Sequence, residues 1–140
     1  MTTTRRHFLA VTAAFALTAS VLPAQAARVL TATEAFAQTA SGKVILIDIR
    51  TPEEWAETGS GVGAKRLYMR RDDFVSALDK ILGGDKSKPV ALICARGVRS
   101  SRLSRALRES GYANIIDVPE GMLGSYAGPG WLERGLPVAQ

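Results

Sequence analysis

Three continuous runs of branched apolar residues alternate along the chain with segments whose apolar residues recur at helical spacing. The runs occupy residues 43–49, 89–93 and 114–118 and are typical of strands that are covered on both faces. The periodic segments predict helices, which we place at about residues 31–39, 52–59, 73–82, 100–110 and, as one turn, 131–134. Strands and helices that alternate in this way predict an α/β domain, with a parallel sheet and helices on both of its faces.

Capping signals indicate where two of the helices begin. Thr31 with Glu34, and Thr51 with Glu54, have the spacing of a capping box, in which each pair satisfies free amides at the helix start. Pro52 stands at the first helical position, where its missing amide costs nothing. Between the second and third helices we expect a loop at residues 59–63 and a short strand at 64–68.

The third and fourth helices carry weaker start signals. We expect Asp72 or Asp73 to begin the third helix, and Ser100 or Ser101 to begin the fourth. Gly111 is the expected end of the fourth helix. In that helix we predict leucine and alanine facing inward and arginine facing solvent: Leu103, Ala106 and Leu107 inward, and Arg102, Arg105 and Arg108 outward.

The first 26 residues have the pattern of an export signal. Arg5 and Arg6 precede an uncharged apolar stretch, and Ala24-Gln25-Ala26 places small residues where a signal peptidase cleaves. A membrane span needs about 20 residues, and this stretch is shorter. The segment resembles a bacterial twin-arginine signal, with Thr4 for the usual Ser and Ala10 for the common Lys.

We therefore interpret residues 1–26 as a cleavable export signal, residues 27–140 as one mature domain and the location as periplasmic. No stable membrane insertion is expected after cleavage. An uncleaved anchor and a buried N-terminal helix are the alternatives.

Composition and charge restrict the chemistry. The 140 residues are 46% hydrophobic and 22% charged, as in globular domains, and the formal charge of +5 becomes +3 when Arg5 and Arg6 leave with the signal. This mild, scattered charge favours small anionic substrates over nucleic acid. A single cysteine excludes an internal disulfide and a cysteine-rich zinc cluster. The one histidine, His7, lies in the signal, so no histidine-containing metal site is expected in the mature domain.

Cys94 is the candidate reactive residue. It directly follows the run at residues 89–93, at the carboxyl end of a predicted strand, where open parallel sheets bind ligands. In the loop that follows, Gly97 permits a sharp turn and the successive amides can form an anion nest. Arg96, Arg99 and the helix N-terminus add positive charge. These effects favour the thiolate over the alternative, a small buried hydrophobe.

The lack of a histidine in the domain narrows what this cysteine does. A cysteine–histidine pair for acyl transfer is excluded. Sulfur transfer fits, because a thiolate attacks a sulfane sulfur without needing a base. The resulting persulfide is an anion, which the same amides can stabilise.

At these residues the sequence resembles a single-domain rhodanese, a sulfurtransferase, over about residues 28–138. The resemblance rests on Asp48-Ile-Arg50, Glu54-Trp55, Gly59 to Ala64, Cys94-Ala-Arg-Gly-Val-Arg99-Ser100 and Gly135-Leu-Pro-Val138. It implies a rhodanese-like three-layer fold and a Cys94 persulfide. The residues whose amides would hold the persulfide are Ala95, Arg96, Gly97, Val98 and Arg99. Related phosphatases and arsenate reductases have a loop one residue longer.

The chain departs from the family pattern at two places. Residues 59–64 lack the usual histidine and proline, which puts local rigidity in doubt more than activity. Residues 120–130 replace the usual glycine pair with a longer loop, which either flanks the site and alters the choice of acceptor or is a surface insertion.

Other residues have mainly structural interpretations. Asp48 and Arg50 are expected to join Glu54 in an ion-pair network, and Trp55 and Trp131 are expected to pack in the core or against loops. Arg96 and Arg99 either contact substrate or pair with acids, and we expect at least one of them to contact substrate.

The function predicted from the sequence is that of a periplasmic thiosulfate sulfurtransferase, which passes sulfur from thiosulfate through Cys94 to cyanide or a thiol. The alternative is a persulfide carrier that exchanges sulfur with a partner protein and turns over free thiosulfate poorly. Either interpretation allows a sulfur-relay or reducing protein as a partner. The sulfurtransferase reaction needs neither a metal nor an organic cofactor. A non-catalytic anion-binding domain is a third interpretation.

Overall fold

The computed structural model describes residues 28–140, so the predicted signal at 1–26 lies outside the described residues. Its centre is a parallel five-stranded sheet in the order β1-β6-β5-β2-β4. The strands are β1 (Arg28–Val29), β2 (Ile45–Asp48), β4 (Lys65–Arg66), β5 (Val90–Ile93) and β6 (Ile115–Asp117). A separate antiparallel pair joins β3 (Ser60–Gly61) to β7 (Val138–Ala139).

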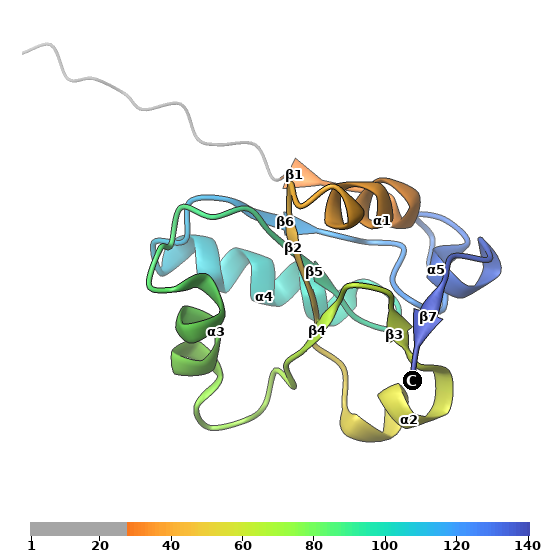
Figure 1. Ribbon diagram of the computed structural model, residues 1–140, viewed down its shortest axis with the longest axis horizontal. Helices are drawn as coiled ribbons and strands as arrows, with labels where there is room; N and C mark the ends of the chain where they lie inside the picture. Colours follow the sequence, from red (N-terminus) through yellow and green to blue (C-terminus); the bar gives the residue numbers. More distant parts are fainter. Residues whose placement is uncertain (1–27) are drawn as a thin grey trace, which may run out of the picture.

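Helices cover both faces of the sheet and make a three-layer α/β domain (Figure 1). They are α1 (Ala32–Ala40), α2 (Pro52–Thr58), α3 (Phe74–Leu82), α4 (Val98–Glu109) and α5 (Gly130–Glu133). Helices α3 and α4 contribute to one apolar cluster, whereas α1 and α5 contribute to the other. The predicted fold class is therefore confirmed. None of the helices within residues 28–140 combines the length and the apolar character needed to cross a bilayer.

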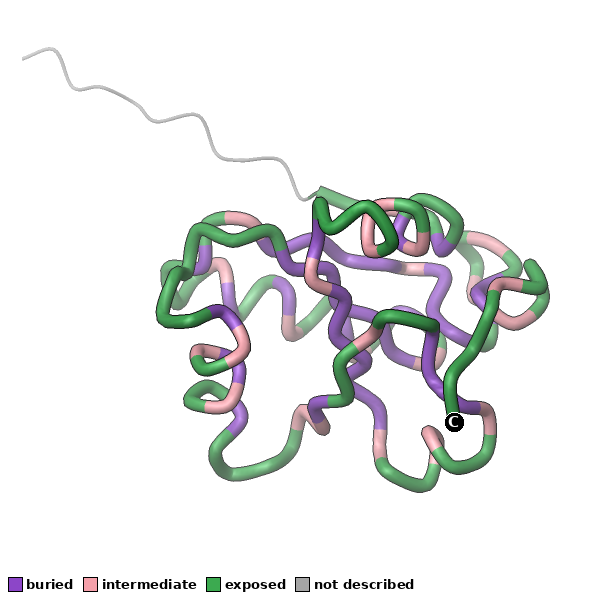
Figure 2. Tube along the Cα trace, in the orientation of Figure 1, coloured by how far each residue is buried: buried purple, intermediate pink, exposed green. Residues whose placement is uncertain are grey.

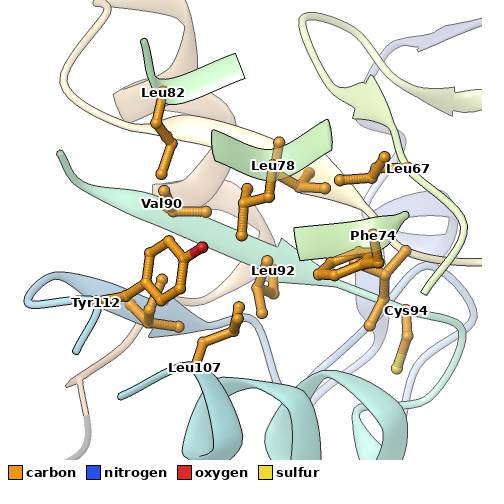
Figure 3. Packing of buried hydrophobic residues seen from close by; sticks show 12 residues of the cluster. Leu67, Phe74, Leu78, Leu82, Val90, Leu92, Cys94, Leu107 and Tyr112 are labelled. Atoms are coloured by element: carbon orange, nitrogen blue, oxygen red, sulfur yellow. The ribbon is translucent and has the colours of Figure 1, made fainter. Parts of the chain in front are cut away.

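The two clusters follow from the alternation of side chains along each strand. In β5, Val90 and Leu92 belong to the cluster on the α3 and α4 side, while Ala91 and Ile93 belong to the other. Cys94 continues the first set, and Figure 3 shows it among the side chains of that cluster. Apart from Ile45 at the start of β2, the strands at the centre are buried along their length (Figure 2), which explains their unbroken apolar sequence.

Both predicted capping boxes are present. Thr31 Oγ1 accepts from the amide of Glu34, and the Glu34 carboxylate accepts from the amide of Thr31; Thr51 and Glu54 do the same at α2. At α3 the expected start at Asp73 is confirmed, but its side chain forms an ion pair with Arg71 instead of capping.

The predicted start of α4 is wrong. The helix begins at Val98, with Gly97 as its N-cap at φ +83°, rather than at Ser100 or Ser101. Helix α4 ends at Glu109 with Ser110 as its cap, and Gly111 follows at positive φ. The expected inward face is also partly wrong, because Ala106 is exposed. The face packed on the sheet is instead the stripe of Ser100, Leu103, Ser104 and Leu107, which has regular helical spacing.

The segment that lacks the family's histidine and proline is held by other contacts. Residues 59–63, expected as loop, contain the short strand β3, whose Ser60 and Gly61 pair with Ala139 and Val138 of β7. Ser60 also accepts a hydrogen bond from Arg66 Nε at 2.9 Å. These contacts supply the rigidity that the sequence put in doubt.

Strand order determines where the site lies. β2 and β5 are parallel neighbours with Asp48 opposite Ile93, so the segments that follow them emerge at the same edge of the sheet. The chain then runs from β2 into α2 and from β5 into α4. Cys94 therefore lies in the crevice at the carboxyl ends of the central strands, where this class of sheet binds ligands.

Candidate active site

The sulfur of Cys94 takes the place of a capping side chain at the start of α4. Gly97, the N-cap residue, has no side chain to satisfy the free amides of the first turn. Cys94 Sγ accepts hydrogen bonds from the amides of Gly97 at 3.2 Å and Ser100 at 3.4 Å, and lies 3.5 Å from Ser100 Oγ. With Cys94 only 1% exposed, these donors and the helix N-terminus form a sheltered environment suited to an anionic sulfur.

Close backbone packing holds this loop in shape. A Cβ atom on Gly97 would collide with the carbonyl oxygen of Pro119, and a Cβ atom on Gly121 would collide with that of Ala95. Both glycines have positive φ, +83° and +69°, which L-residues with side chains adopt at a cost. The segment that follows β6 therefore packs directly against the loop and restricts its conformation.

Residues 120–130 flank the site rather than forming a surface insertion. The amides of Met122 and Leu123 donate to the carbonyls of Cys94 and Ala95, both at 2.9 Å. Glu120, 1% exposed, accepts from Arg134 at 2.7 and 2.8 Å and from the amide of Gly130. The segment thus forms an ordered wall beside the cysteine loop.

Arg99 is tied to α2 by an ion pair. Its guanidinium donates to both carboxylate oxygens of Glu54, at 2.8 and 2.6 Å, and this contact lowers the pKa of Glu54 to about 2. Glu54 is also the capping-box carboxylate of α2. One side chain therefore fixes both the start of α2 and the cysteine loop, 45 residues apart.

Asp48 and Arg50 form a second, fully buried pair. Arg50 Nη2 lies 2.8 Å from Asp48 Oδ2 and also donates to the carbonyl of Gly59 at 2.7 Å. Toward Glu54, however, Arg50 reaches only the main-chain carbonyl, at 3.3 Å. The expected network thus exists as two separate pairs, which together attach both ends of α2 to the sheet and the loop.

The predicted site residues differ in what they contact in the structure. Gly97 directs its amide at Sγ, Arg99 pairs with Glu54, and Arg96 is exposed with one bond from Nη1 to the carbonyl of Gly124 at 3.3 Å. Ala95 and Val98 complete the loop. Sequence reasoning missed Ser100 as a sulfur contact, although a serine on the apolar stripe of α4 was a usable signal.

Trp131 packs in the core as expected, whereas Trp55 is half-buried and lies outside both apolar clusters. Trp131 is fully buried, meets the ring of Phe36 edge-on at 5.8 Å and donates from Nε1 to the carbonyl of Pro137 at 3.0 Å. Trp55 lies under the guanidinium of Arg66 at 5.9 Å.

The fold agrees with the comparison to known families. The model of the rhodanese-like domain matches residues 31–126, and the chain belongs to this family. Among solved structures, the polysulfide-sulfur transferase homodimer from Wolinella succinogenes is 28% identical, with a TM-score of 0.63 over 81% of this chain and 78% of that one. A rhodanese-like domain protein from Staphylococcus aureus is 26% identical, with a TM-score of 0.58 over 81% and 99%.

A curated relative has the name of a sulfurtransferase. The tRNA sulfurtransferase of Shewanella woodyi is 37% identical over 86 residues, which are 61% of this chain and 17% of that protein. The present chain thus corresponds to about a sixth of that relative's length.

Proposed function

We propose that this protein is a periplasmic sulfurtransferase that moves sulfane sulfur from thiosulfate to cyanide or a thiol through a persulfide on Cys94. The observation that carries the proposal is the sulfur itself. It is buried, it accepts hydrogen bonds from two main-chain amides, and it lies at the N-terminus of α4. Family membership and a relative named as a sulfurtransferase support it.

The reaction requires no proton transfer by a side chain. The Cys94 thiolate attacks the outer sulfur of thiosulfate, a sulfur–sulfur bond to Sγ forms, and the bond to the sulfonate sulfur breaks. Its electron pair leaves with sulfite. Cyanide or a thiolate then takes the outer sulfur, and the electron pair returns to Sγ. Charge is negative throughout, so oriented amides are the appropriate catalytic device, and the domain's lack of histidine is no obstacle.

The structure favours Arg96 over Arg99 as the donor-binding arginine. The charge of Arg99 is compensated by Glu54, whereas Arg96 is exposed and has no carboxylate partner among the described residues. A guanidinium at the edge of the loop whose charge no carboxylate compensates is suited to the sulfonate group of thiosulfate.

The first measurement is the intact mass of the protein after incubation with a sulfur donor. The mature protein, residues 27–140, is incubated with thiosulfate or, in parallel, with polysulfide, the donor class in the name of the Wolinella relative. Cys94→Ser is the control, because the serine oxygen still accepts the loop amides. One added sulfur on the wild type alone, followed by catalytic thiocyanate formation with cyanide, supports the proposal. If neither donor adds sulfur to Cys94, the proposed reaction is wrong.

A persulfide carrier is the second candidate. The 1% exposure of Cys94 is compatible with it, because a sheltered sulfur can be reached by a docked partner segment as well as by a small donor. A protein that gains sulfur but turns over slowly with cyanide, and quickly only with a partner protein, is the carrier. Export by the twin-arginine route belongs to the same proposal and rests on Arg5 and Arg6 of the sequence.

A further inference from the structure

A groove of about 370 Å³ lies beside the cysteine loop, on the side of α4. Its lining includes Arg96 from the loop, Arg102 and Arg105 from α4, and Pro119 and Tyr126 from the segment after β6. We call it the arginine groove. The proposed reaction of thiosulfate at Cys94 uses Arg96 but gives no role to Arg102, Arg105 or Tyr126.

The groove is suited to anions. Its three arginines are exposed, and in the described part of the chain none forms an ion pair with a carboxylate. Asp117 is the acidic residue in the lining, but it is only 7% exposed and burial raises its pKa. The outward-facing charge is therefore that of the guanidinium groups, which bind carboxylates in pairs of hydrogen bonds.

The groove is also flanked by exposed apolar surface. Tyr126 is 100% exposed and Val98 is 59% exposed, and both line the groove. Leu123, on the same segment as Tyr126, is 41% exposed. Arginine and tyrosine are enriched at protein interfaces, whereas a small inorganic anion makes no use of apolar side chains. The combination indicates a peptide.

The groove and the sulfur share a residue. Gly97 lines the groove, and its amide lies 3.2 Å from Cys94 Sγ. An extended peptide advances about 3.3 Å per residue, so a segment bound in the groove carries a neighbouring residue to the loop. Cys94 itself is 1% exposed and does not line the groove, so the bound segment must pass over the edge of the loop to bring its thiol to the sulfur.

We propose that the arginine groove docks a short acidic, cysteine-bearing segment of a protein partner, which exchanges sulfur with Cys94. This rests on the proposed persulfide. In the transfer, the partner's thiolate attacks the outer sulfur of the persulfide and a new sulfur–sulfur bond forms. The bond to Sγ breaks, its electron pair stays on Sγ as the thiolate, and the outer sulfur keeps its negative charge in the partner's new persulfide. No oxidant or reductant is consumed.

Two synthetic peptides of equal length test the docking. Each has one cysteine, flanked by glutamates in the first and by glutamines in the second. With protein already carrying the persulfide, we expect the glutamate peptide to remove sulfur about tenfold faster at low salt. In Arg102→Gln/Arg105→Gln this ratio should fall below about twofold. A control, Lys43→Gln/Lys88→Gln, removes equal charge at the amino ends of the strands and should keep the ratio.

A further variant and a small thiol distinguish a bound peptide from a bound small acid. Tyr126→Ala should slow the glutamate peptide but not mercaptosuccinate, a small thiol with two carboxylates. Equal rates for the two peptides overturn the proposal. So does a Tyr126→Ala variant that leaves the peptide unaffected while the arginine variant slows mercaptosuccinate equally, because the groove then takes a small acid.

A binding measurement keeps this test independent of sulfur loading. The glutamate peptide with alanine in place of cysteine is titrated into the unloaded protein, and calorimetry compares wild type with the arginine variant. Weaker binding by about tenfold supports the docking even if no donor loads Cys94. Equal affinity of the two proteins refutes the docking even if the persulfide forms.

Discussion

Replacing Gly97 by alanine tests whether close packing of the loop positions the sulfur. Gly84→Ala is a matched control. The two glycines have nearly equal φ, +83° and +79°, but only at Gly97 would a Cβ atom collide with the backbone, at the carbonyl of Pro119. At Gly84 nothing lies within 4 Å.

The magnitudes follow from this difference. The left-handed conformation costs a residue with a side chain about 1–2 kcal/mol, so both variants lose that much. Near this domain size, each kcal/mol lowers Tm by about 4–8 °C. Gly97→Ala should lose about 1–3 kcal/mol more, the usual cost of overpacking. Its loop must move away from Pro119, which weakens the amide bond to Sγ.

The kinetic consequence is larger than that of the control. A hydrogen bond to a charged group contributes about 1.5–3 kcal/mol, so losing it should slow persulfide formation about 10- to 100-fold. Gly84→Ala should load at the wild-type rate.

Thermal unfolding by circular dichroism and timed intact-mass measurements at 25 °C provide the two readouts. If Gly97→Ala loads sulfur as fast as Gly84→Ala, the packing against Pro119 does not position the amide and the reasoning fails.

Three other perturbations have defined outcomes. Because Arg99 holds the pKa of Glu54 at about 2, below its ordinary 4.5, the ionised pair stabilises the fold above pH 4.5 and this contribution disappears as the pH falls toward 2. The Tm difference between wild type and Glu54→Gln should therefore be constant above about pH 5 and shrink below it; a difference that grows in acid contradicts the assignment. Trp131→Ala should cost about 3–5 kcal/mol in urea unfolding, because the indole is fully buried; a loss below about 1 kcal/mol would show that its burial contributes little. In a Gram-negative host, Arg5→Lys/Arg6→Lys in the full chain should remain in the cytoplasmic fraction, and periplasmic recovery equal to wild type would exclude the twin-arginine route.

Local signals in the sequence predicted the elements that depend on local interactions. Both capping boxes involve residues three positions apart, such as Thr51 and Glu54, and both formed. The apolar runs gave the three central strands, because strands buried on both faces need apolar side chains throughout. The two-residue strands β1 and β7 were not predicted, since exposed edge pairs leave no periodic pattern.

The start of α4 was mispredicted for a nonlocal reason. A serine is the usual sign of a helix start, but here Cys94, at the end of the preceding strand, supplies the acceptor and the helix begins at Val98. Ser100 lies instead against the sulfur. The Arg99–Glu54 contact joins residues 45 positions apart, and no pattern within either segment specified it.

Because the sulfur of Cys94 caps α4, the amides at the helix start respond to the chemical state of that sulfur. Gly97 and Ser100 direct their amides at Sγ, and a persulfide moves the negative charge one atom outward from that position. Hydrogen exchange at these two amides should therefore differ between the empty and the sulfur-loaded protein. The amides at the start of α4 thus report whether Cys94 carries the extra sulfur, and spectroscopy can detect this without removing the sulfur.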